Sequence, residues 1–148
     1  IKLGKLNYFA TGIGIIFLLL IPASVYSSLF GAEFSEIKNH FIILAPGILA
    51  LSLSNALSHY FAGVGQHKFN TQSSIFGLGI TIIIGYFLIY QLGTIGAAFA
   101  ASIVYVLQTI YQLAMLKRST EVQYKDLLLG KEDFKTMIEI VKEKLGKN

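Results

Sequence analysis

Four long runs of apolar residues, separated by short polar segments, dominate the pattern along this chain. They cover residues 6–30, 41–61, 73–92 and 95–116, and none contains an aspartate, glutamate, lysine or arginine. A helix needs about 20 apolar residues to cross the hydrocarbon core of a bilayer, and helices of soluble proteins seldom stay uncharged for that length. The pattern therefore predicts an all-α, polytopic membrane bundle with four transmembrane helices at these positions.

Glycine, proline and polar residues mark the predicted connections between these helices. The connection at 91–94 has room only for a tight turn, so the third and fourth helices are expected to form an antiparallel hairpin. Longer connections are predicted at 31–40 and 63–72. Pro22 and Pro46 fall inside the first two helices, where each removes a backbone donor and produces either a fixed kink or a hinge.

The distribution of charge predicts how the helices are oriented in the membrane. The chain has 148 residues, of which 54% are hydrophobic and 14% charged, with 12 basic residues and a net charge of +4. All the basic residues except Lys38 fall in the ends of the chain or in the connection at 63–72. By the positive-inside rule, both termini and that connection are cytoplasmic. The basic residues are explained as a topology signal of a cell-membrane protein, and no nucleic-acid partner is expected.

Charged and polar residues take over abruptly after residue 116, where the predicted membrane region ends. Within this tail, apolar residues recur at helical spacing over 131–145 and predict an amphipathic cytoplasmic helix. It would lie either on anionic headgroups or against the remainder of a larger protein. Because the sequence begins with Ile1 and shows no signal-peptide cleavage site, we interpret the chain as a fragment of a larger protein.

The second predicted helix carries a stripe of polar residues along one side. At about 100° per residue, Ser52, Asn55 and His59 project close together, joined by Gln66 if the helix continues past Gly63. Unpaired polar groups are costly in hydrocarbon, so this stripe is expected to face other helices or a water-filled cavity. We interpret it as a candidate substrate cavity.

Small and polar residues also define one face of each of the last two helices. In the third, Ser73, Gly77, Thr81 and Gly85 recur every four residues and predict close helix packing. In the fourth, the corresponding face is more polar. It carries Tyr105, Gln108 and Gln112, which indicate either a cavity lining or hydrogen bonds between helices.

No catalytic constellation, metal site or cofactor motif is evident, so an enzyme is not expected. The chain has no cysteine, which excludes thiolate chemistry, and its three histidines do not pair at helical spacing. Histidine exchanges a proton near neutral pH, which makes His59 a possible proton relay. Relays in membranes usually include a carboxylate, and none lies within the predicted helices, so we expect an interface histidine instead.

Three strings carry a resemblance to a known family. They are "IPASVYSSLFGAEFSE" at 21–36, "LAPGILALSLSNALSHYFAGVGQHKFNTQSS" at 44–74 and "YQLGTIGAAFAASIVY" at 90–105. In order and spacing the chain resembles the carboxy-terminal part of oligosaccharide flippases. These are the polysaccharide-export proteins of the multidrug, oligosaccharidyl-lipid and polysaccharide exporter superfamily.

The resemblance implies a fragment of a two-lobed transporter that moves a polyprenyl-diphosphate-linked glycan across the membrane by alternating access. Its expected partners are membrane lipid, the lipid-linked glycan and the remaining transmembrane helices. Two alternatives stay open, a multidrug or lipid II exporter of the same fold and a membrane scaffold without transport activity. Cationic residues suited to a diphosphate are absent from the four predicted helices, so they would come from helices outside this chain.

Overall fold

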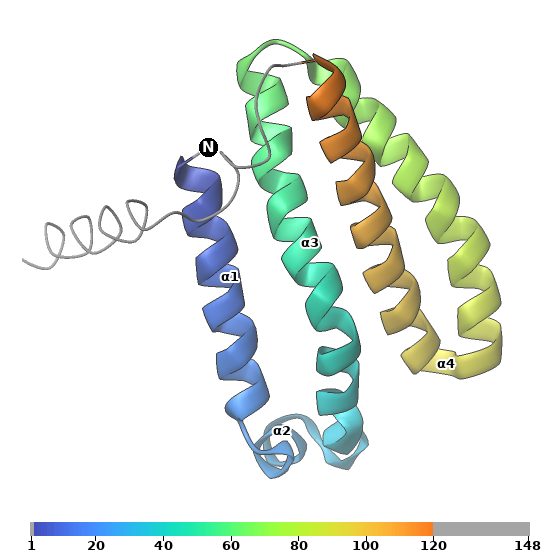
Figure 1. Cartoon of the computed structure of the whole chain (residues 1–148). Coiled ribbons are helices and arrows are strands. Elements are labelled where there is room, and N and C mark those ends of the chain that lie inside the picture. The colour runs from blue at the N-terminus through green and yellow to red at the C-terminus, as the bar shows by residue number, and fades with distance from the viewer. Residues whose placement is uncertain (1, 120–148) are drawn as a thin grey trace, which may run out of the picture.

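The structure, a computed structural model, describes residues 2–119, which form helices joined by short connections and contain no strand. Its elements are α1 (Lys2–Leu20), α2 (Ala23–Phe30), a short 3₁₀ helix η1 (Ala32–Glu36), α3 (Ile37–Gly63) and α4 (His67–Ser119) (Figure 1). The predicted helix at 131–145 lies outside the described residues. Long apolar sequences adopt helices because a helix satisfies every interior backbone group within its own segment.

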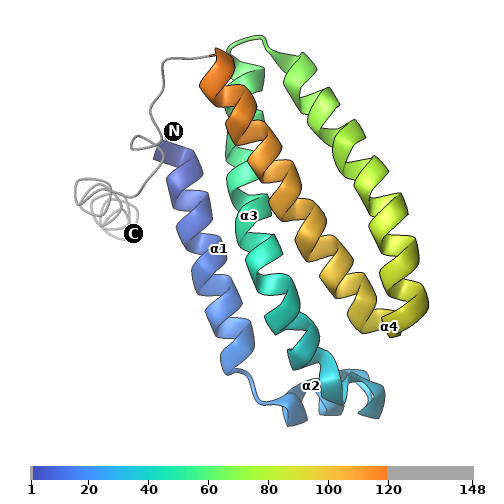
Figure 2. The same ribbon diagram turned by 45° about the vertical axis from the view of Figure 1, so that its right-hand side comes forward.

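The 53 residues of α4 form two arms that fold back on each other at Gly93 (Figures 1 and 2). Gly93 has φ 59° and ψ −134°, a backbone conformation that residues with a Cβ rarely adopt. Side chains join the arms at a distance from the turn, since the rings of Phe76 and Tyr111 stack with centroids 5.2 Å apart. The antiparallel hairpin predicted around 91–94 is therefore present. The preceding connection is shorter than the predicted 63–72, because α4 already begins at His67.

The apolar run at 6–30, predicted as one span with a kink or hinge at Pro22, is divided there into two helices. The segments Asn7–Leu20 and Ala23–Phe30 meet at an angle of 84°. Pro22 causes the break, because it has no N–H to donate to the carbonyl of Leu18, four residues earlier. By contrast, Pro46 lies inside α3, which continues past it as one helix. The predicted loop at 31–40 is also largely helical, since η1 and the first turn of α3 occupy it.

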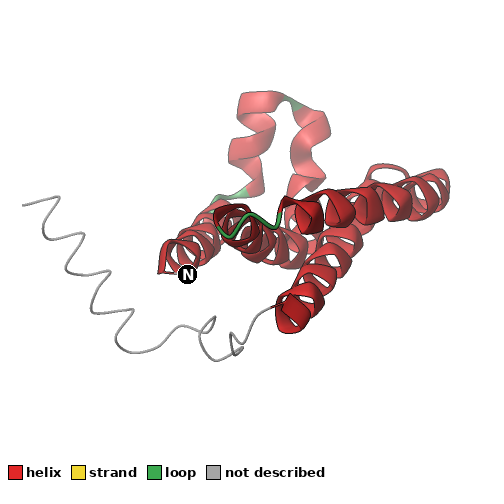
Figure 3. Cartoon of the chain, turned by 90° about the horizontal axis from the view of Figure 1, so that it is seen from above, coloured by secondary structure: helices red, strands yellow, loops and turns green. Residues whose placement is uncertain are grey.

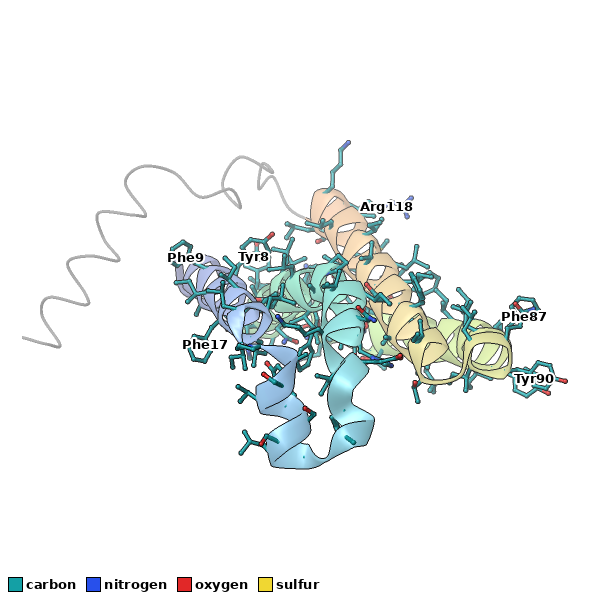
Figure 4. The ribbon with its side chains drawn as sticks, turned by 90° about the horizontal axis from the view of Figure 1, so that it is seen from below. Tyr8, Phe9, Phe17, Phe87, Tyr90 and Arg118 are labelled. Atoms are coloured by element: carbon teal, nitrogen blue, oxygen red, sulfur yellow. The ribbon has the colours of Figure 1, made fainter. Side chains whose placement is uncertain are left out.

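Within the described residues, two helices are long and apolar enough to cross a membrane, namely α3 and α4. The bent pair of α1 and α2 adds a third candidate if the pair is counted as one broken span. In Figure 4, Phe17, Phe87 and Tyr90 point away from the bundle, and their exposed fractions are 65%, 60% and 84%. Such large outward-facing apolar side chains fit a surface that contacts lipid.

The central helix is α3, which packs against α1 on one side and against α4 on the other (Figures 1 and 2). A small core forms near its carboxy-terminal end, where Leu57, Phe61 and Leu116 are at most 2% exposed. Nearer the amino-terminal end of α3, the backbones of α3 and α4 approach closely where Gly47 lies against Ser102. This arrangement places polar residues of α3 on two different sides of the same helix.

Candidate functional site

The first of these sides faces α1 and is anchored by Ser52. The Ser52 side chain is 3% exposed, and its Oγ accepts a hydrogen bond of 3.1 Å from Nδ2 of Asn7. The hydroxyl of Thr11, one helical turn from Asn7, lies 3.2 Å from the same oxygen. Ser52 therefore belongs to the α1–α3 interface, where its polarity is satisfied by neighbouring side chains.

The second side faces the second arm of α4 and centres on Gln112, which is 2% exposed. Ser54 donates a hydrogen bond of 2.8 Å to Oε1 of Gln112. Nε2 of Gln112 donates in turn to Oγ of Ser58, at 3.0 Å. One glutamine thus spans two serines on successive turns of α3. Of the two roles that the sequence left open for Gln112, this geometry favours hydrogen bonding between helices.

Two further polar residues of α3, Asn55 and His59, have exposed side chains. His59 projects within about 20° of Ser52 but lies about two turns farther along the helix. At 100° per residue, Asn55 lies about 60° from Ser52, which faces α1, and about 60° from Ser58, which faces α4. Neither side chain has a hydrogen-bond partner among residues 2–119. We call this pair the α3 polar face. Asn55 and His59 are thus uncovered, whereas Ser52, Ser54 and Ser58 each bond to a side chain of a neighbouring helix.

The remaining candidates, Tyr105 and Gln108, lie on the second arm of α4. Tyr105 is half-buried, and its backbone carbonyl accepts a hydrogen bond from the hydroxyl of Thr109. The half-buried amide of Gln108 packs over Gly77, where an added Cβ would lie 3.2 Å from Cδ of the glutamine. Tyr105 and Gln108 therefore lie on the arm that packs against α3 and the first arm.

Gln66 was expected to join the polar stripe of α3 only if the helix continued past Gly63, and the helix does not continue. The helix ends at Gly63, and Gln66 lies in the connection to α4 after Gly65, whose φ is 74°. Its side-chain oxygen is buried without a hydrogen bond among the described residues. The positive φ of Gly65 turns the chain away from the helical path on which the prediction depended.

The small-residue ladder on the first arm of α4 is buried at three of its four positions. Ser73, Gly77 and Gly85 are buried, as a helix-packing face requires. Thr81 is exposed, and its hydroxyl donates a hydrogen bond of 2.8 Å to the carbonyl of Gly77 within the same helix. The hydroxyl of Thr81 is thus satisfied within its own helix.

Several polar residues that organise the bundle were not singled out by the sequence analysis. Asn7 and Thr11 on α1, and Ser54 and Ser58 on α3, are each polar pairs four residues apart within apolar runs. That spacing places both members of a pair on one helix face, so it was a usable signal. The bond of 3.1 Å between Nε2 of His40 and Oγ1 of Thr94 had no such signal, because the two residues are 54 positions apart.

The site offers an amide and an imidazole as hydrogen-bonding groups. Among the described residues, no three histidine, cysteine, aspartate or glutamate side chains gather closely enough to hold a metal ion. Comparison of the chain with protein-family models, curated proteins and solved structures yielded no match. The function must therefore be inferred from the geometry of the α3 polar face and from the resemblance of the sequence.

Proposed function

We propose that this chain is the carboxy-terminal part of a transporter that flips a lipid-linked oligosaccharide across the cytoplasmic membrane by alternating access. The observation that carries this proposal is the α3 polar face, Asn55 and His59, exposed on a helix with the length and apolarity of a membrane span. Sugars present many hydroxyl groups, so side chains that donate and accept hydrogen bonds suit them. The family resemblance of the sequence agrees with this substrate class.

Energetics explain why the α3 polar face requires water or a polar partner. Moving an amide or hydroxyl from water into an apolar environment without a hydrogen bond costs roughly 2 to 7 kcal/mol. The serines of α3 and Gln112 avoid that cost by bonding to one another. Asn55 and His59 have no such partners in residues 2–119, so a wet cavity formed with the remaining helices of a larger transporter would satisfy them.

Four membrane crossings with both ends in the cytoplasm complete the proposed architecture. Each arm of α4 contains about 26 residues and extends about 39 Å, which exceeds the hydrocarbon thickness of about 30 Å. The connection at 64–66 and the end of α4 lie at the same end of the bundle, opposite α2 (Figure 1). Lys68, Lys117 and Arg118 are exposed at that end, as the positive-inside rule expects of the cytoplasmic side.

Fusions to a reporter that fluoresces only in the cytoplasm test this topology. A reporter placed after Gln66 or Arg118 is expected to fluoresce, because both positions lie at the basic end of the bundle. After Glu36, which follows the bend, the reporter is expected to stay dark. Comparable fluorescence from the Glu36 fusion would contradict the four crossings, provided that immunoblots show similar expression of all three fusions.

Cysteine labelling in the full-length transporter, with other cysteines removed, tests the proposed cavity. Asn55→Cys and His59→Cys are expected to react with a charged, membrane-impermeant thiol reagent, and labelling should abolish glycan export. Three controls should remain unreactive. Leu57→Cys and Gln112→Cys are buried between helices, and Ile110→Cys replaces an apolar side chain that is 56% exposed and faces lipid in this proposal. Unreactive cysteines at 55 and 59 together with normal export would remove the site assignment.

Substrate protection in the same assay separates the flippase from the alternatives. A lipid-linked oligosaccharide should slow the labelling of Asn55→Cys, because the glycan would occupy the cavity. Protection by lipid II or by a cationic drug, without protection by the oligosaccharide, would instead identify an exporter of another class. Labelling that no ligand slows, with export unaffected, would fit a scaffold without transport activity.

A further inference from the structure

The corner between α1 and α2 lies where α1 has crossed most of the thickness of a bilayer core. With 19 residues, α1 extends about 28 Å, and its uncharged part, from Leu6 to Leu20, extends about 22 Å, compared with about 30 Å for the hydrocarbon region. The eight residues of α2 would add about 12 Å if they continued in the same direction. At 84° to α1 they advance by only about 1 Å along its axis. The short helix therefore contributes almost nothing to crossing the membrane.

Specific contacts hold this corner in place. The carbonyl of Leu18 cannot bond to Pro22, and the hydroxyl of Tyr26 donates to it instead, at 2.8 Å. Tyr26 is 6% exposed, and its ring meets Phe41 of α3 edge to face, with centroids 5.6 Å apart. The backbone N–H of Val25 also donates to the carbonyl of Pro22, at 3.0 Å. These contacts hold the angle between α1 and α2.

The two sides of α2 differ in polarity. At 100° per residue, its three serines fall within an arc of about 100°, and its larger apolar residues occupy the opposite arc. The serines are Ser24, Ser27 and Ser28, and the apolar group is Val25, Tyr26, Leu29 and Phe30. Tyr26 reaches back to the last turn of α1 and so orients the helix. The apolar side of α2 therefore faces toward the rest of the bundle, and the serine side of α2 faces the opposite way.

The apolar side is only partly used within the described residues. Leu29 is 72% exposed and Phe30 is 61% exposed, although Tyr26 beside them is buried. Viewed along the bundle, α2 and η1 project sideways beyond the other helices (Figures 3 and 4). In a membrane, α2 would extend sideways from the bundle at one edge of the hydrocarbon core. Its apolar side would then face the acyl chains of the surrounding lipid.

We propose that α2 is an interfacial helix that lies flat on the bilayer surface opposite the Lys117–Arg118 end of α4. Val25, Leu29 and Phe30 insert among the outermost acyl-chain segments, and the serines face water. The partner is lipid, and the proposal concerns the membrane anchoring of the chain without depending on what the transporter carries. Amphipathic helices in this position bury their apolar side about 5–10 Å deep, at the boundary between headgroups and acyl chains.

Tryptophan fluorescence in vesicles measures the depth of α2 directly, because the chain contains no tryptophan of its own. Leu29→Trp, Phe30→Trp, Ser28→Trp and Ile13→Trp would each be reconstituted in phosphatidylcholine vesicles whose acyl chains are brominated at a shallow or a deep position. Ser28 lies on the opposite side of α2, and Ile13, 53% exposed near the middle of α1, is the reference for the bilayer centre. Leu29 and Phe30 are exposed, so tryptophan fits there, and Tyr26 stays in place to hold the corner.

We expect shallow bromines to quench Leu29→Trp and Phe30→Trp about twofold or more strongly than deep bromines do, and the reverse for Ile13→Trp. Aqueous iodide should quench Ser28→Trp most strongly of the four. Stronger quenching of positions 29 and 30 by deep bromines would show that α2 is the end of a bent span, and would overturn the proposal. Protection of both positions from bromine and iodide alike would also overturn it, because a second copy or another protein would then cover this side.

Discussion

Gly47→Ala is expected to reduce the folded yield of the protein sharply, because the substitution adds one methyl group where two helix backbones meet. The new Cβ would lie 2.5 Å from Cα of Ser102 and 2.9 Å from its Oγ. Carbon atoms pack at about 3.5–4.0 Å, so α3 and α4 would have to separate by about 1 Å. No side-chain rotation relieves the contact, since the obstructing Cα belongs to the backbone. Overpacking of this kind costs typically about 1–3 kcal/mol.

Separation of the two helices would also weaken bonds elsewhere along the interface. The Ser54–Gln112 bond is 2.8 Å long, and the hydroxyl of Thr109 donates to the carbonyl of Ala50 at 2.8 Å. Size-exclusion chromatography in detergent and a thermal melt would measure the loss. Gly14→Ala is the matched control, because nothing lies within 4 Å of a Cβ there. Equal yields and melting temperatures for the two variants would refute the close approach at Gly47.

Gly96→Ala is expected to be at least as damaging, for a reason confined to the hairpin of α4. A Cβ at Gly96 would collide with the carbonyl oxygen of Leu88 and lie 2.5 Å from the carbonyl carbon, both in the backbone of the first arm. The arms would have to open just beyond the turn at Gly93. The expected result is a fall in melting temperature and folded yield comparable with or greater than that of Gly47→Ala.

Gly79→Ala serves as the control for the hairpin, because it changes the same residue type in the same helix. Nothing lies within 4 Å of a Cβ at Gly79, and the position is exposed. Alanine favours helix by about 1 kcal/mol over glycine in water, so this variant should be as stable as the original chain or slightly more stable. If Gly96→Ala and Gly79→Ala have the same melting temperature, the arms are not in backbone contact at Leu88.

The α3 polar face illustrates how far spacing along a helix can predict a site. Helical periodicity correctly grouped Ser52, Asn55 and His59 on one half of α3, because the angle between residues is a property of the helix alone. The same periodicity could not predict which of these residues a neighbouring helix would cover. Ser52 proves to be covered by α1, whereas Asn55 and His59 are exposed, and only the position of α1 makes that distinction.

Gln112 also shows what helical periodicity could not predict, because this residue proves to be buried and hydrogen-bonded. Its polarity within an apolar run fitted a cavity as well as it fitted a hydrogen bond between helices. Ser54 and Ser58 decide between the two, because α3 brings their hydroxyl groups to both ends of the Gln112 amide. These serines are more than 50 positions away in the sequence, so no local pattern could identify them as its partners.

Local sequence features are enough to predict the helices, the membrane-compatible apolar surfaces and the hairpin at Gly93. Each of these depends on local physics, namely backbone bonds within a segment, the length of an apolar run and the conformational freedom of one glycine. Tertiary structure alone decided the burial of Gln112, the close approach at Gly47 and the fixed corner at Pro22. The proline predicted a disturbance there, but its 84° angle is held by Tyr26 and Phe41, and their contacts exist only once α1, α2 and α3 have packed together.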